Sequence, residues 1–184
     1  MSAGASALPL PDPPLGDQVV SLRSWAASDL PDLVAGVDAT VHRFRYSVPH
    51  SEAEARSWLD LAESDRRRGR RLELAVLDRA AQSPVGSVSI WDIDPLHRSA
   101  MISYWMGPAG RGRGLTTHAV GLLADWAFGE LGLERLTAEV ELENHASQRL
   151  AERCGFVREG RLRNHHKRRD GTRVDSLLYG LVRA

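Results

Sequence analysis

The sequence predicts an α+β domain with a mixed central sheet, and three patterns indicate it. Residues 72–77, 85–93 and 100–106 are strand-like runs separated by short turns. These short connections indicate an antiparallel meander, because a parallel pair would need a crossover of a dozen or more residues. A helical pattern, a strand and a second helical pattern follow within residues 115–154. The chain then ends in two strand-like runs around Asp170-Gly171, a dipeptide typical of hairpin turns.

The start of the chain divides into an arm and a strand. Residues 1–17 contain four prolines and no hydrophobic periodicity, which predicts a flexible, partly extended arm. Within 18–24, Val20 and Leu22 alternate with polar neighbours as in a short strand. We therefore expect one folded domain over residues 18–184.

Two helices should follow this strand. Ser28 is a suitable N-cap for a helix over about 29–39. Ser51 and Glu54 form a capping-box pattern at the start of a second helix, over 51–68. The apolar stripe expected on this second helix consists of Trp58, Leu61 and Ala62.

Helices and strands alternate in the second half. A glycine-rich loop at 107–114 leads into a helix that ends near Gly129, and its apolar positions recur every three or four residues. The remaining expected elements are a strand over 135–141, a helix over 144–154 and strands over 156–162 and 173–181.

Composition limits the class of protein. The 184 residues carry 24 basic and 24 acidic side chains, an ordinary balance for a globular domain. Cys154 is the single cysteine, which excludes an internal disulfide and a multi-cysteine zinc site and fits a reducing compartment. The sequence lacks an apolar run long enough for a membrane span, and it lacks a secretory signal. We therefore expect a cytoplasmic protein with no membrane partner and no metal.

Charge is distributed unevenly along the chain. Residues 1–64 hold nine acids and four bases, whereas residues 65–184 hold fifteen acids and twenty bases. A basic C-terminal region suits an anionic ligand such as a nucleotide cofactor, or nucleic acid.

The glycine-rich loop carries the main functional signal. Three glycines within 110–114 let the backbone turn sharply and approach a ligand. The N–H groups of the helical turn that follows are unpaired, and with the helix dipole they favour phosphate. Further donors and positive charges would come from Thr116, Thr117, Arg111 and Arg113. The alternative is a flexible surface loop that binds nothing.

Two other phosphate motifs fit this loop poorly. A Walker loop needs Gly-Lys-Ser/Thr, and the single lysine of the chain is Lys167. A dinucleotide fingerprint needs a third glycine where Thr117 stands, and it needs a parallel sheet.

Two pairs of short motifs stand out in the second half of the chain. Tyr104-Trp-Met106 precedes Arg111-Gly-Arg-Gly114, and Asn144-His-Ala-Ser147 precedes Arg153-Cys-Gly-Phe156. The first pair resembles motif A of the GCN5-related N-acetyltransferases (GNAT), in which Arg/Gln-x-x-Gly-x-Gly/Ala cradles the CoA pyrophosphate. The second pair resembles the Asn-x-x-Ser and Lys/Arg-x-Gly-Phe segments of the RimJ/RimL branch. The resemblance covers about residues 19–183.

This resemblance implies a GNAT-type mixed sheet and acetyl-CoA as cosubstrate. In such enzymes the pantetheine amides pair with the backbone of the fourth family strand like an added strand. Thr116 departs from the motif, because Gly or Ala is usual at that position. The residues expected to bind the cofactor are Trp105, Met106, Arg111, Gly112, Arg113, Gly114, Leu115, Thr116, Thr117, Asn144 and Arg153. Asn144 also suits a plain N-cap, and Arg153 a solvated surface.

The resemblance also implies direct attack of an amine on the thioester. A backbone N–H near Met106 would face the carbonyl oxygen of the thioester. Ser147 would protonate the departing sulfur or hold a water molecule near that sulfur. The alternative is that Ser147 is an ordinary surface serine. The family usually has a carboxylate that acts as the base on the strand after Gly-Phe, and His166 stands at that position here. The alternative base is His165. The third possibility is that both histidines are ordinary surface residues. Adjacent strand residues face opposite sides, so the two histidines should not bind one metal together. Cys154 should be a small buried side chain, in agreement with a mechanism that forms no acyl-enzyme.

The acceptor should be a primary amine bound by the first two helices and the segment between them. That segment, His42 to His50, is rich in aromatic and cationic side chains. Such side chains suit a peptide terminus or an anionic or aromatic substrate. The alternative is that the segment is a plain packed loop. The main expectation is the N-terminal α-amine of a protein or peptide, since its pKa near ~8 leaves a neutral fraction at pH 7. The alternative acceptor is a small amine, either an antibiotic or a polyamine.

Two rival hypotheses differ in kind. A catalytically silent relative would bind acyl-CoA as a sensor. An RNA-binding module would use its arginines, five of which lie within Arg66–Arg71, although such a run is commonly solvated. A homodimer is left open.

Overall fold

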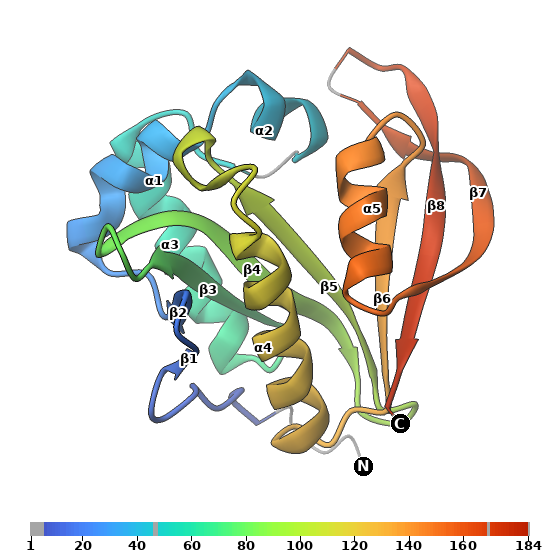
Figure 1. The fold of residues 1–184 in the computed structure, drawn as a ribbon, viewed down its shortest axis with the longest axis horizontal. Coiled ribbons are helices and arrows are strands. Elements are labelled where there is room, and N and C mark those ends of the chain that lie inside the picture. Colours follow the sequence, from blue (N-terminus) through green and yellow to red (C-terminus); the bar gives the residue numbers. More distant parts are fainter. Residues whose placement is uncertain (1–5, 46–47, 169, 184) are drawn as a thin grey trace.

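A mixed sheet of eight strands lies at the centre of the computed structural model, which describes residues 6–45, 48–168 and 170–183 (Figure 1). The strands are β1 (Leu15–Gly16), β2 (Val20–Arg23), β3 (Arg71–Asp78), β4 (Ser83–Asp94), β5 (Ser99–Met106), β6 (Arg135–Glu141), β7 (Val157–Lys167) and β8 (Arg173–Val182). The helices are α1 (Leu30–Gly36), α2 (Ala39–Phe44), α3 (Glu52–Arg67), α4 (Leu115–Gly129) and α5 (His145–Arg153). None of these helices is both long and apolar enough to cross a membrane.

The strand order is β1-β2-β3-β4-β5-β6-β8-β7. Neighbours from β1 to β5 are antiparallel, β5 and β6 are parallel, and β8 runs antiparallel to both β6 and β7. The predicted mixed sheet, its meander and its final hairpin are therefore confirmed.

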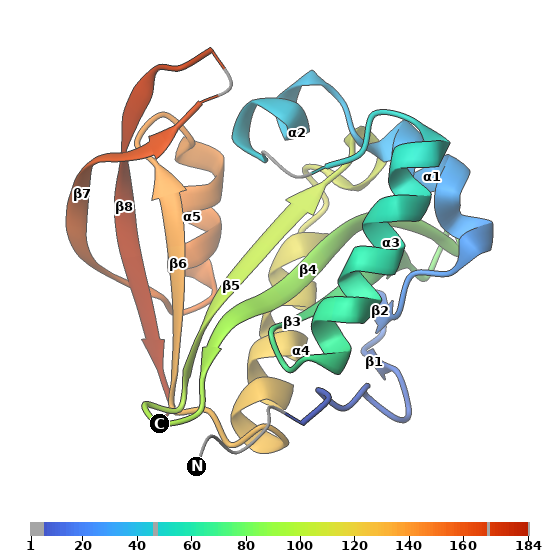
Figure 2. The ribbon, with the colours of Figure 1, turned by 180° about the vertical axis from the view of Figure 1, so that it is seen from behind.

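Strands β5 and β6 pair at one end only. Ser99–Met101 lie beside Arg135–Thr137, and the parallel ladder stops there. Beyond this point the two strands diverge, and α2 lies over the open end of the sheet (Figures 1 and 2). The sheet therefore contains a gap, with unpaired backbone on the facing edges of both strands.

Helices cover both faces of the sheet. α4 and α5 lie on one face, whereas α1 and α3 lie on the other (Figures 1 and 2). The larger core joins α4 to the sheet through residues such as Leu123 and Leu136, both fully buried. A second core under α1 and α3 contains Leu33 and Trp105, and the Trp105 ring stacks on Trp25 with centroids 6.3 Å apart. Burial of each large apolar side chain contributes about 1.5–3 kcal/mol.

Part of the predicted arm is packed against the domain. The Leu8 side chain is only 8% exposed. Its N–H donates to the Arg66 carbonyl (2.9 Å), and the Arg66 guanidinium donates back to the Leu8 carbonyl (2.6 Å). Leu15–Gly16 form the edge strand β1. The prediction of a flexible arm is therefore wrong for these residues, because they gain apolar and backbone partners; residues 1–5 lie outside the described chain.

The first helix is shorter than predicted and starts differently. Ser28 is not its N-cap, because it lies inside a 3-10 turn, Ala27–Asp29, that precedes α1. The buried Asp29 carboxylate fixes this turn: it accepts a hydrogen bond from the Ala26 N–H (2.8 Å) and pairs with Arg23 (2.6 Å). The helix ends at Gly36.

The segment predicted as a connection contains the separate helix α2. Asp38 caps this helix, because its carboxylate accepts a hydrogen bond from the Val41 N–H (3.0 Å). Residues 46–47 of the predicted connection lie outside the described residues.

Helix α3 presents a different face from the predicted one. Ala55 is fully buried, and Trp58 and Leu59 pack on the second core. Leu61 is 57% exposed, so its place in the predicted stripe was wrong. The cause is that the inward face contains residues 55, 58 and 59, each three positions before a member of the predicted stripe.

The contrast between two helical leucines predicts a difference in stability. Leu123→Ala removes a fully buried side chain from α4 and should lower the free energy of unfolding by about 2–5 kcal/mol. Leu61→Ala makes the same chemical change on the exposed face of α3 and should change it by less than about 0.5 kcal/mol. Urea unfolding of both variants measures the difference, and equal losses would contradict the burial described above.

Candidate active site

A cavity of about 830 Å³ lies where β5 and β6 diverge. Its walls come from β5, β6, α2, α5 and the loop before α4, with His166 from β7. This volume is typical of a pocket for a cofactor or small ligand. Among the predicted site residues, those in the walls are Trp105, Met106, Arg111, Gly112, Gly114, Thr116, Thr117, Asn144, Ser147, Arg153 and His166. Arg113 and Leu115 are not wall residues, and Leu115 is buried in the core.

The loop before α4 forms a cradle of backbone N–H groups. Gly112 and Gly114 have φ of 72° and 77°, a left-handed conformation that favours glycine. A Cβ built at either glycine would meet nothing within 4 Å, so the space beside the loop is open. No N–H group of residues 112–116 donates to an acceptor in the described part of the chain. These donors lie at the start of a helix, where the dipole favours an anion, so the loop fits a diphosphate.

The two arginines of this loop form internal ion pairs. The Arg111 guanidinium makes two contacts of 2.7 Å with the Asp38 carboxylate, and its Nε donates to the Met106 carbonyl (2.9 Å). Arg113 pairs with the buried carboxylate of Asp78. Each arginine holds the pKa of its aspartate partner below the usual range. Both guanidiniums therefore fix the loop in this structure, and phosphate binding by them stays a prediction.

Trp105 presents its side chain to the face opposite the cofactor cradle. The ring is packed in the second core, and its indole N–H has no hydrogen-bond partner among the described residues. The Gly107 N–H donates to the Val85 carbonyl, so in this antiparallel ladder the N–H and C=O of Trp105 point to Ser87 on β4. The backbone groups that face the gap are therefore those of Tyr104 and Met106.

Asn144 and Ser147 lie together at the start of α5. The Asn144 Oδ1 accepts a hydrogen bond from the Ser147 N–H (3.1 Å), so the N-cap interpretation of Asn144 is confirmed. The Tyr104 hydroxyl lies 2.8 Å from the Ser147 Oγ. Burial raises the pKa of Tyr104 to about 12, so the phenol stays protonated at neutral pH and can donate to the serine. Tyr104 was not among the site residues predicted from the sequence, although its position two residues before Met106 places it on the same strand face.

Both histidines of β7 lie beside Glu139. The strand is irregular between Leu162 and His166, and Asn164 has φ of 51°, so the regular alternation of side chains is broken. The Glu139 Oε2 lies 2.7 Å from the His165 Nε2 and 3.5 Å from the His166 Nε2. The expectation that the rings face opposite sides was therefore wrong. Within the described residues, the three side chains each bring one ligand atom to within 4.8 Å of the others, a spacing compatible with a metal ion.

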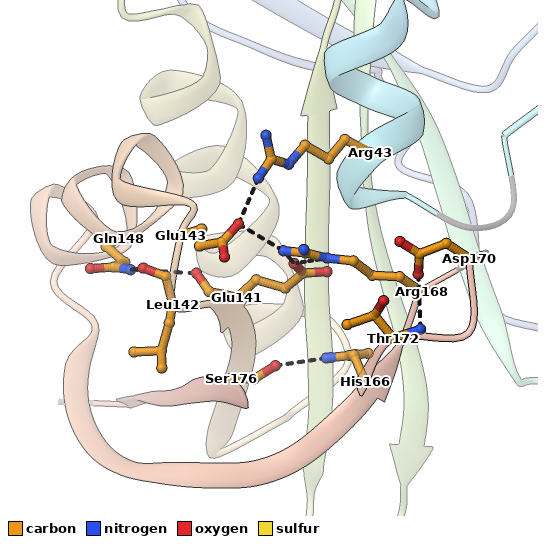
Figure 3. A network of polar contacts seen from close by, with 10 residues as sticks. All are labelled: Arg43, Glu141, Leu142, Glu143, Gln148, His166, Arg168, Asp170, Thr172 and Ser176. Carbon is orange, nitrogen blue, oxygen red and sulfur yellow. Dashed lines mark hydrogen bonds and ion pairs between the residues drawn. The ribbon is translucent and has the colours of Figure 1, made fainter. Parts of the chain in front are cut away.

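His166, rather than His165, belongs to the cavity wall. Its Nδ1 lies 2.7 Å from the hydroxyl of Ser176, which is fully buried (Figure 3). Burial lowers the pKa of His166, and the nearby Glu139 carboxylate opposes this shift. A lowered pKa means that the imidazole is mainly neutral at pH 7, the form that accepts a proton.

Two arginines of α5 border the cavity. Arg149 and Arg153 are exposed wall residues four positions apart, so they share one helix face. Of these two arginines only Arg153 was predicted from the sequence, although the spacing of four positions was a signal for Arg149.

An ion-pair network links α2 to the final hairpin. Arg168 contacts Glu141 (2.7 Å) and Glu143 (2.9 Å), and Arg43 contacts Glu143 (2.6 Å) (Figure 3). The buried Glu141 carboxylate requires this cation. The exposed Arg43–Glu143 pair should contribute little to stability.

A family model described as an acetyltransferase (GNAT) domain matches residues 20–157. The chain belongs to this family, so the predicted resemblance and the acyltransferase class it implies are confirmed at the level of the family.

Relatives and solved structures agree with this assignment. YdaF of Bacillus subtilis, provisionally named a ribosomal N-acetyltransferase, is 35% identical over 97 residues, 53% of this chain and 50% of YdaF. The spermidine N(1)-acetyltransferase of Vibrio cholerae is 32% identical over 87 residues, 47% of this chain and 50% of that protein. The matches thus span about half the length of both relatives. A GCN5-related N-acetyltransferase from Brucella melitensis has a TM-score of 0.80 and 28% identity, covering 96% of this chain and 82% of its own.

Cys154 should react slowly with alkylating reagents. Burial raises the pKa of its thiol to about 11, so at pH 8 the reactive thiolate is scarce and increases only as the pH approaches 11. Iodoacetamide at pH 8 should modify the folded protein roughly a hundredfold more slowly than the same chain in urea. Mass spectrometry measures both rates, and similar rates would contradict the buried thiol.

Proposed function

We propose that the chain is an acetyl-CoA-dependent N-acetyltransferase whose acceptor is a primary amine, in the first place the N-terminal α-amine of a protein or peptide. The observation that carries the proposal is the set of unengaged N–H groups in residues 112–116, next to the diverging edge of β5. A cradle for a diphosphate thus lies beside an open strand edge that suits the amides of pantetheine.

The cofactor would be held by backbone more than by side chains. Residues 112–116 would bind the pyrophosphate through N–H groups, and the β5 edge at Tyr104 and Met106 would pair with the pantetheine arm. Arg149 and Arg153 would face the remaining phosphate charge. When bound, acetyl-CoA supplies an activated acetyl thioester.

Three groups of the chain would act on protons and charge. His166, neutral and in the cavity wall, would accept the proton of the amine. Ser147 would donate a proton toward the sulfur, and Tyr104 would replace it across their 2.8 Å contact. The backbone N–H near Met106 would face the carbonyl oxygen, and the Arg111 bond to the Met106 carbonyl fixes the next peptide, between Met106 and Gly107.

The second candidate is acetylation of a small amine. Its support is the similarity to a spermidine N(1)-acetyltransferase, whereas YdaF carries a ribosomal name. The cofactor motifs are common to both and do not decide between these acceptors. A cytoplasmic location, a homodimer and the absence of a metal stay predictions.

The arginine run is partly neutralised. Arg66 and Arg67 share the Glu63 carboxylate, and Arg71 pairs with Glu73. Two carboxylates offset two of the five arginine charges, so the positive charge on which RNA binding depends is reduced but not removed, and RNA binding stays the lower-ranked alternative.

Two substitutions at one glycine test the cradle. Gly114→Asp and Gly114→Asn place side chains of the same size at a left-handed position that both residues tolerate better than most. The carboxylate should weaken acetyl-CoA binding at least about tenfold more than the amide, because it would lie against a diphosphate. Calorimetric titration of both variants gives the comparison, and equal affinities would sink the loop assignment.

A CoA-release assay over amines tests the function as a whole. The panel contains peptides with free N-termini, polyamines and aminoglycoside antibiotics, and release should be fastest with peptides. Tight acetyl-CoA binding without release for any amine would instead identify an acyl-CoA sensor.

Ser147→Ala should lower kcat about tenfold or more with little change in acetyl-CoA affinity, since the hydroxyl acts on the leaving sulfur.

A further inference from the structure

Arg45 brings an uncompensated positive charge to the cavity. It follows α2 and lines the cavity that Ser147 and His166 also line. In the described part of the chain, its side chain forms no hydrogen bond and no ion pair, although the Glu73 carboxylate and the Arg71 guanidinium are near enough to act on its charge. Burial lowers the pKa of Arg45, but a guanidinium stays charged all the same. Arg45 is therefore a cation that, among the described residues, has no carboxylate in direct contact.

Arg71 adds a second guanidinium that is already matched. Its Nε donates to one oxygen of Glu73 (2.8 Å), and the other Glu73 oxygen accepts from the Ser87 hydroxyl (2.5 Å). Glu73 is thus fully engaged and neutralises one arginine only. Two guanidiniums and one carboxylate leave this wall of the cavity with a net positive charge.

A carboxylate lies across the cavity from the Arg45 wall, although Arg149 and Arg153 of α5 add positive charge on that side too. Arg45 and Arg71 belong to the side of α2 and β3, together with the apolar surface of Trp91. Across the gap between β5 and β6 lie Glu139 and His166. The second side suits an amine, whereas the first repels a second cation and attracts an anion.

We propose that Arg45, supported by Arg71, binds an oxyacid group of the acceptor, so that the preferred acceptor carries a carboxylate or phosphate close to its reacting amine. Guanidinium groups match such anions with two parallel hydrogen bonds. Within the proposed function, on which this inference rests, the acceptor is then a peptide whose N-terminal amine is followed by an acidic residue. A polyamine has no group for Arg45 and is disfavoured.

Matched peptides test the inference. Three amidated peptides differ only in their second residue, which is Asp, Asn or Lys, and a fourth carries phosphoserine there. We expect kcat/KM to be at least about tenfold higher for Asp than for Asn, and lowest for Lys. The phosphoserine peptide and a free amino acid show whether phosphate or an α-carboxylate serves as well as a side-chain carboxylate.

Variants of Arg45 give the decisive comparison. Arg45→Gln should bring the Asp/Asn ratio close to one, and Arg45→Lys should keep most of it. The matched control Arg43→Gln removes the same charge two positions away, outside the cavity wall, and should leave the ratio unchanged. Unaltered acetyl-CoA affinity confirms that each variant is folded. An Asp/Asn ratio near one in the unmodified protein, or a ratio unaffected by Arg45→Gln, would overturn the inference.

A binding measurement separates this inference from the proposed function. Calorimetry with the protein saturated with CoA measures peptide affinity without turnover. Tighter binding of the Asp peptide that Arg45→Gln abolishes, with no acetylation, would refute the enzyme and retain the anion site. Acetylation of all peptides at equal rates would retain the enzyme and refute the anion site.

Discussion

The incomplete pairing of β5 and β6 is the constraint on which the site depends. A backbone N–H or C=O inside a sheet needs a partner, and the parallel ladder between these strands ends after Met101. The diverging edges therefore leave hydrogen-bonding groups on the walls of a cavity instead of in a ladder. The N–H cradle of residues 112–116, the Tyr104–Ser147 contact and His166 all lie around this opening. A ligand that pairs like a strand would complete the sheet.

Asp38 connects the two halves of the site. One carboxylate caps α2 through the Val41 N–H and pairs with Arg111, whose Nε holds the Met106 carbonyl. The helix that bears Arg45, the cradle and the end of β5 are thereby positioned relative to one another. The arginine that begins the family motif thus has a structural task in this chain: it orders the backbone that would bind phosphate.

The sequence predicted what depends on local pattern. The central strands, the glycine-rich loop and the Asn144 cap follow from periodicity and from residue types with strong backbone preferences. The sequence did not predict which residues become partners through tertiary contacts. The Asp38–Arg111 pair spans 73 positions, and the convergence of His165 and His166 depends on an irregularity in β7 that no side-chain pattern announces. Leu61 shows the same limit on a helix, since two adjacent apolar faces are equally periodic until packing selects one.

In the proposed enzyme, cofactor binding and acceptor selection would occupy different parts of this cavity. The cofactor side is built from backbone and from motif residues, and such a cradle accepts the same diphosphate whatever the acceptor is. The acceptor side is built from side chains outside the motifs, with Arg45 at the end of α2 and Glu139 and His166 across the gap. The amine of an acceptor would have to reach the imidazole of His166 beside the Glu139 carboxylate. Such an acceptor would bind most tightly when the rest of its molecule carries a negative charge that contacts Arg45. In the proposed enzyme, the charge of the acceptor would therefore be selected by segments that lie outside the family motifs.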